Sequence, residues 1–85
     1  MFRIWAKVFS EDHIAKQLTY KSEEKFTYAN FFRYLTEICD GLDIPTPVIL
    51  KTHLFNYAKF RHVVFRRGDF MESVEFDKLV LENID

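Results

Sequence analysis

The sequence predicts a small α+β domain in which two helices pack on one face of a small antiparallel sheet. Three observations predict this class. Two stretches near the N-terminus, 2–9 and 14–21, alternate apolar and polar residues in the manner of strands. The stretch 22–41 repeats apolar residues at steps of three and four, the period of an amphipathic helix. Only two Gly and two Pro occur in 85 residues, which argues against a loop-rich or disordered chain.

Length and composition predict one domain over 1–85 with an aromatic core. Eighty-five residues leave too little chain for a second core. Aromatic residues make up 18% of the chain, and ten of them are Phe. Each buried aromatic side chain removes roughly 150–250 Å² from water, so few residues supply most of the packing. A small chain this apolar also leaves aromatic side chains at its surface, and we expect a homodimer to cover them.

The two alternating stretches predict an antiparallel β-hairpin, joined by the polar stretch 10–13. One side of the first strand is apolar and carries Phe2, Ile4, Ala6 and Val8. The other side carries Arg3, Trp5, Lys7 and Phe9. In the second strand the residues expected on the apolar side are Ile14, Leu18 and Tyr20. This apolar side is the expected seat of the helix that follows.

The stretch 22–41 is the clearest helix of the chain. Its apolar face consists of Tyr28, Phe31, Phe32, Leu35, Ile38 and Cys39, and Leu42 continues it. Ser22 stands where a side chain can cap the first turn, and Gly41 where a left-handed residue can close the last. We therefore expect the helix to run between these two residues.

A second helix is expected after the connector 41–47, which holds both prolines and is extended and stiff. Thr46 followed by Pro47 is typical of a helix start, and apolar residues continue the helical period to about Arg61. The alternative is a buried strand that starts at 48–50, because Val, Ile and Leu follow one another there.

The C-terminal part predicts two strands around a turn. The stretch 62–66 is β-branched and aromatic, and 67–69 turns the chain. Residues 74–84 fit a helix face and also a strand buried on both sides. We prefer the strand, because a two-stranded hairpin is only marginally stable and has an open edge. The expected element order is β-β-α-α-β-β.

The main function hypothesis is a small non-enzymatic protein-interaction or regulatory domain that self-associates. Its expected interface consists of Arg3, Trp5, Lys7, Phe9 and Phe55. Trp together with Arg is typical of residues that dominate binding at interfaces. The competing interpretation is that the C-terminal segment or the second helix covers these side chains. The expected partner is a second copy of the chain or another protein.

The alternative hypothesis is weak binding of nucleic acid or another polyanion through the basic segment 51–67. Its candidate residues are Lys51, Lys59, Arg61, Arg66 and Arg67. Lys51, Phe55 and Lys59 are four residues apart, which places an aromatic ring between two cations on one helix face. The segment is followed by an acidic tail, 69–85, that can neutralise it, so nucleic acid is the less favoured partner.

No catalytic, metal or cofactor signature appears in the sequence, and we expect no enzyme activity, metal or cofactor. The chain has no phosphate-binding glycine loop, no nucleophile elbow and no HExxH. The histidines (His13, His53, His62) lack zinc-type spacing, and Cys39 is expected to be a buried packing thiol. The acids Asp69, Glu72 and Glu75 do not match a calcium loop and are expected to be solvated.

Charge and cysteine content predict a cytoplasmic protein without a membrane partner. The formal net charge of −1 gives no general bias toward anionic membranes. A single cysteine cannot form an internal disulfide, which favours a reducing compartment. No run of about 18 apolar residues occurs, and the first residues lack a signal-peptide core.

Overall fold

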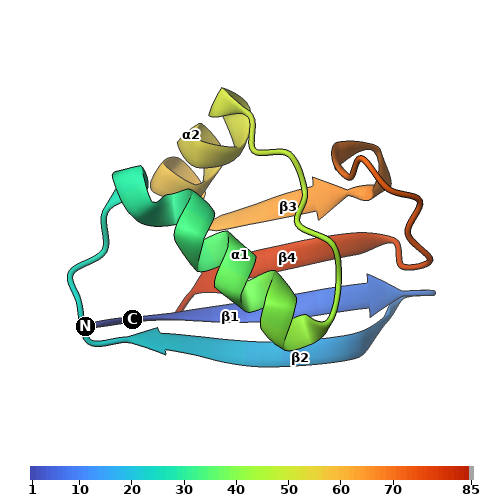
Figure 1. Ribbon diagram of the computed structural model, residues 1–85, viewed down its shortest axis with the longest axis horizontal. Coiled ribbons are helices and arrows are strands. Elements are labelled where there is room, and N and C mark those ends of the chain that lie inside the picture. The colour runs from blue at the N-terminus through green and yellow to red at the C-terminus, as the bar shows by residue number, and fades with distance from the viewer. Residues whose placement is uncertain (85) are drawn as a thin grey trace.

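The computed structural model, which describes residues 1–84, shows a four-stranded antiparallel sheet with two α-helices on one face (Figure 1). The strands are β1 (Phe2–Ser10), β2 (His13–Ser22), β3 (His62–Arg66) and β4 (Lys78–Asn83), in the spatial order β2-β1-β4-β3. The helices are α1 (Phe31–Leu42) and α2 (Lys51–Phe60), with short 3₁₀ turns η1 (Tyr28–Asn30) and η2 (Arg67–Asp69). The predicted fold class and element order are confirmed.

The core lies between the helices and one side of the sheet. Along β1 every second residue from Phe2 to Val8 is buried, as the alternation predicts. These side chains meet the buried face of α1, which includes Tyr34, Leu35 and Ile38. No helix within residues 1–84 is both long and apolar enough to cross a membrane.

The hairpin turn is shorter than predicted. Only Glu11 and Asp12 connect β1 to β2, and both have positive φ, 52° and 67°. Positive φ at both central residues matches the right-handed twist of the two strands. Asp77 ties this turn to the C-terminal segment: its carboxylate accepts the Glu11 N–H at 2.9 Å, and its own N–H donates to the Phe9 carbonyl at 2.8 Å.

A β-bulge changes the expected pattern of β2. Val8 pairs with Lys16 but Phe9 pairs with Ile14, so Ala15 is left over. The extra residue shifts the alternation, and Ile14 is 38% exposed. The prediction that Ile14 shares the apolar side of Leu18 is therefore wrong.

Helix α1 begins at Phe31, so the predicted start at Ser22 is wrong. Ser22 ends β2, and its hydroxyl accepts the Glu24 N–H at 3.2 Å. The chain must first cross the end of the sheet so that Phe26 can pack against Phe2, at 5.2 Å between ring centres. A continuous helix from Ser22 would not make this crossing.

The end of α1 also differs from the prediction. The left-handed residue is Asp43, with φ of 57°, and Gly41 lies within the last turn. A Cβ at Gly41 would approach Leu18 Cδ2 to 3.0 Å, so the glycine lets the helix lie close to β2.

Helix α2 begins at Lys51, so the predicted start at Thr46-Pro47 is wrong. The connector stays extended because the Val48 N–H donates to the Asp69 carbonyl at 2.7 Å. The Leu50 N–H donates to Nδ1 of His53 at 2.8 Å, which satisfies one of the free donors at the start of the helix. The helix ends at Phe60, one residue from the predicted end.

The predicted C-terminal strand is confirmed, although it is shorter than 74–84 and is fully buried on one side only, so the prediction of burial on both sides is wrong. Strand β4 lies in the middle of the sheet between β1 and β3, where Leu79 and Leu81 are fully buried. The apolar stretch that fitted both a helix face and a buried strand therefore contains a central strand of the sheet.

Candidate binding surface

The candidate site is the side of the sheet that faces away from the helices. No helix within residues 1–84 covers this side (Figure 1). We call it the open face; its side chains are Arg3, Trp5, Lys7 and Phe9 of β1, Ile14, Gln17, Thr19 and Lys21 of β2, His62, Val64 and Arg66 of β3, and Lys78, Val80 and Glu82 of β4.

Trp5 stands near the middle of the open face and is held by its neighbours. Its indole N–H donates to Oε1 of Gln17 at 3.0 Å. The Nζ of Lys7 lies 4.0 Å from the centre of the indole and 3.1 Å from Oε1 of Glu82. A cation over an indole is attracted by the negative face of the ring. The ring is therefore half-buried and fixed on a surface that faces solvent.

Phe9 repeats this arrangement toward the hairpin end. The Nζ of Lys78 lies 5.1 Å from the centre of the Phe9 ring. Lys78 is opposite Arg66 in the β3–β4 register, so a second cation continues the row. Phe9, Lys78 and Arg66 border a hollow of about 320 Å³ together with Asp12 and Asp77. The carboxylate of Asp77 is already engaged by the Glu11 N–H and by Arg67.

The open face is basic although the chain as a whole is not. Five Lys or Arg side chains lie on it, namely Arg3, Lys7, Lys21, Arg66 and Lys78. Among the described residues its one carboxylate is Glu82, which pairs with Lys7, while Asp12 and Asp77 lie beside it at the hairpin end. The fold therefore gathers cations on one face, although the formal net charge of the whole chain is −1.

Four residues of the predicted interface lie together here, and the fifth does not. Arg3, Trp5, Lys7 and Phe9 share the open face, whereas Phe55 belongs to α2 on the other side of the sheet. Phe55 is 62% exposed, and the Lys59 Nζ lies 5.7 Å from its ring. Sequence reasoning missed Lys78, because its place beside Phe9 depends on the β1–β4 register.

The predicted anion-binding residues are distributed over several parts of the molecule. Lys51 and Lys59 belong to α2, and Arg61 follows that helix in a left-handed conformation. Arg66 belongs to β3, at the edge of the open face. Arg67 pairs with Asp77 at 3.0 Å and also donates to the carbonyls of 75 and 76. The last residue of the predicted acidic tail, Asp85, lies outside the described residues.

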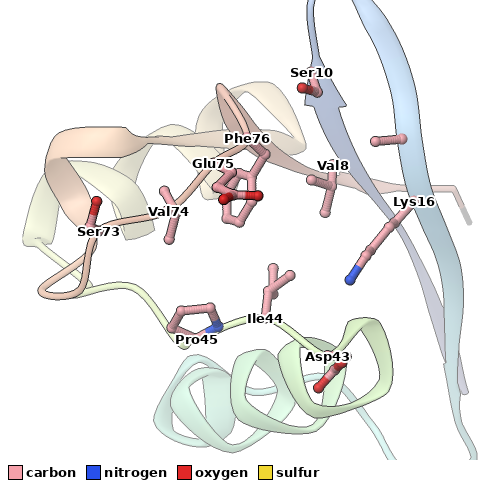
Figure 2. Close-up of a pocket in the computed structure, with 11 residues that line it drawn as sticks. Val8, Ser10, Lys16, Asp43, Ile44, Pro45, Ser73, Val74, Glu75 and Phe76 are labelled. Carbon is pink, nitrogen blue, oxygen red and sulfur yellow. The ribbon is translucent and has the colours of Figure 1, made fainter.

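A pocket of about 390 Å³ lies on the helix side of the sheet, between the connector and the loop before β4 (Figure 2). Ile44, Val74 and Phe76 give it an apolar wall, and Glu75 stands at its rim. Figure 2 shows the Lys16 side chain pointing into it. The Lys16 ammonium donates to the Leu42 carbonyl at 2.9 Å, so this cation stabilises the C-terminal end of α1.

The buried His53 and the half-buried Asp69 form a pair that joins α2 to η2. Because Nδ1 of His53 accepts the Leu50 N–H, the ring proton belongs on Nε2, which lies 3.4 Å from Oδ2 of Asp69. The same carboxylate oxygen accepts the Arg66 N–H at 2.9 Å. These contacts are all internal and fix the position of α2.

Cys39 is fully buried in the core, as predicted. Burial raises the pKa of its thiol to about 12, which disfavours the thiolate. Residues 1–84 contain no group of three or more His, Cys, Asp or Glu side chains that could hold a metal ion.

Comparison with protein-family models, curated proteins and solved structures finds no match to this chain. What the protein binds must therefore be inferred from the chemistry of its own surfaces. The open face differs from the rest of the surface in combining a sheet surface without a helix over it, two aromatic rings that each lie under a lysine ammonium, and an excess of cations.

Proposed function

We propose that this protein is a non-enzymatic binding module whose recognition surface is the open face. The observation that carries the proposal is the placement of Trp5 and Phe9, each with a lysine ammonium over its ring, on the side of the sheet away from the helices. Large aromatic side chains held in place lose little conformational freedom on binding, which is why they dominate binding energy at interfaces.

The partner that fits this surface presents negative charge. Five cations and one carboxylate on the open face attract an anionic molecule and raise its association rate at low salt. Two copies stacked through this face would oppose cations with cations, because a two-fold interface brings the same patch of each copy together. The open face is therefore a poor site for the homodimer.

Self-association through the helices is a second candidate, favoured by exposed rings on that side. Phe32 of α1 and Phe55 and Phe60 of α2 each expose more than half of their surface, at 62%, 62% and 54%. Light scattering during size-exclusion chromatography tests it. A dimer mass that falls to the monomer mass in Phe55→Ser supports this candidate, and a monomer mass for the unchanged chain excludes it.

Site-specific photo-crosslinking tests the main proposal. A photoreactive amino acid replaces Thr19, which lies opposite Trp5 on the open face, and in a second protein Asn56, which is exposed on α2. We expect crosslinked species from position 19 and few or none from position 56. Digestion of the products with nuclease or protease then identifies the class of partner. Crosslinks from position 56 alone would contradict the proposal.

The location of the protein stays a prediction. The single cysteine is buried in the core and has no second thiol to pair with. A reducing compartment such as the cytoplasm fits this composition.

A further inference from the structure

We propose that the partner of the open face is a single-stranded nucleic acid, whose bases stack on Trp5 and Phe9 and whose phosphates contact the surrounding cations. This inference rests on the proposed function, because it names the occupant of the same surface. It uses residues that sequence reasoning assigned to two separate hypotheses, the aromatic interface and the basic segment.

The spacing of the two rings suits an extended strand of nucleotides. Trp5 and Phe9 are four residues apart on one strand, which separates their Cα atoms by about 13 Å. Flat π-faces on an open sheet accept bases of any sequence, and four-stranded sheets with helices on the opposite side are used in this way. The hydrogen bond from the indole N–H to Gln17 holds the Trp5 ring in place before binding, and Lys7 occupies one face of the ring until a base displaces it.

The cations lie along the path that the sugar–phosphate backbone of a bound strand would take across the sheet. Lys7 and Lys78 lie beside the rings, and Arg66 continues the second row on β3. When a base stacks on Trp5 it displaces the Lys7 ammonium, which is then free to contact the adjoining phosphate. The ring and its cation therefore serve the base and the phosphate of one nucleotide.

The surface shape favours a single strand over a duplex or an acidic peptide. The bases of a duplex are stacked on one another, so their faces are not free to stack on Trp5 and Phe9, whereas the bases of a single strand can be splayed out. An acidic peptide satisfies the cations, but it offers a ring to stack on Trp5 or Phe9 only where it carries an aromatic residue. Every nucleotide of a single strand carries both a base and a phosphate, so a strand of any sequence uses both features.

The chain's one tryptophan lies at the centre of the proposed site, which makes binding directly measurable. We would titrate the full chain with a 12-nucleotide oligo(dT) and an oligo(U) at 50 mM salt and follow the Trp5 fluorescence. Stacking of a base on the indole is expected to quench the emission. Three or four phosphate contacts predict a slope of log K against log salt of about −2 to −3, or roughly thirty-fold weaker binding at 200 mM salt.

Matched lysine variants locate the binding surface. Lys78→Gln is expected to weaken binding about five-fold and to reduce the salt slope by about 0.7, the value for one lost phosphate contact on a single strand. The controls are Lys51→Gln and Lys59→Gln on α2, which are expected to leave the affinity unchanged. Loss of binding in the α2 variants with full binding in Lys78→Gln would overturn the inference.

The aromatic platforms are tested by Phe9→Leu, which keeps an apolar side chain and leaves Trp5 as the reporter. Removal of one stacked base is expected to weaken binding about five-fold or more. Circular dichroism and the thermal midpoint show whether the variant is folded. If it is not, the Lys78→Gln result decides the question alone, because that substitution leaves the core intact.

Two further results separate this inference from the function on which it rests. An acidic peptide of equal charge that quenches Trp5 as strongly as the oligonucleotide would overturn the nucleic-acid assignment. No quenching by either oligonucleotide at 50 mM salt, with crosslinks still formed at position 19, would also overturn it and would leave the binding module in place. The absence of both signals would contradict the inference and the proposed function together.

Discussion

The Nζ of Lys7 lies 4.0 Å above the centre of the Trp5 ring and at the same time pairs with Glu82 at 3.1 Å. The lysine thus joins β1 to β4 on the open face and shields the indole from water. A large aromatic side chain can remain on a surface without a helix over it because its neighbours cover it in this way. The same lysine is the group that a bound base would displace.

Glu82→Gln is expected to strengthen oligonucleotide binding, by about three-fold, because it removes the carboxylate that competes with a phosphate for Lys7. Fluorescence titration of Trp5 measures the change. Glu37→Gln is the control, since Glu37 lies on α1, away from the open face. Equal gains in both variants would show a general charge effect, and no gain in Glu82→Gln would contradict the proposed role of Lys7.

Asp43→Gly is expected to raise the free energy of unfolding by about 1 kcal/mol. Asp43 has φ of 57° and follows the last turn of α1, where glycine relieves the left-handed strain and an acid is unfavourable to the helix dipole. Asp43→Asn keeps a residue that tolerates this conformation and removes only the charge, so the difference between the variants measures the strain. Urea unfolding gives both values. A loss of stability in both would show that the Asp43 carboxylate is stabilising.

Tyr34→Phe is expected to lower the free energy of unfolding by about 1–2 kcal/mol, because it removes two hydrogen bonds made by a buried hydroxyl. The hydroxyl of Tyr34 accepts the Thr27 N–H at 3.2 Å and donates to Oε1 of Glu24 at 3.2 Å, and the side chain is fully buried. These bonds hold the segment between β2 and α1 on the core. Tyr28→Phe is the control on an exposed tyrosine, and equal losses in the two variants would contradict this role.

The alternation in β1 and the helical period of 31–42 predict much of the fold, because both sequences place one apolar face on a single core. The element boundaries are harder to predict. Ser22 and Thr46 are good capping residues by type, but β-strand pairing and the Val48–Asp69 backbone bond extend the chain at those places. Tertiary contacts therefore override the local capping preference.

Only part of the candidate site can be predicted from the sequence, for a related reason. Arg3, Trp5, Lys7 and Phe9 lie on one strand, so a period of two places them together. Arg66 and Lys78 come from strands that are distant in sequence and join the site through the order β1-β4-β3. One sequence shows the composition of a strand face, whereas strand order and register follow from the packing of the whole chain.

Stability is expected to fall at alkaline pH through Cys39. Burial raises the pKa of this thiol from 9.0 to about 12, so the folded state keeps a proton that the unfolded state loses above pH 9. The protonated thiol contributes fully to the free energy of unfolding below about pH 9. This contribution is lost as the pH rises toward 12, and the free energy of unfolding falls by up to about 1.4 kcal/mol per pH unit. Tyr20, whose pKa is raised from 10.0 to about 12 by burial and by its hydrogen bond to Glu37, adds a loss of the same sign above pH 10.

Urea unfolding at several pH values, repeated with Cys39→Ala, separates the two groups. The variant is less stable near neutral pH because it leaves a cavity, and this deficit is expected to shrink as the pH rises above 9; a deficit that stays constant up to pH 11 would show that the thiol keeps an ordinary pKa in the folded protein.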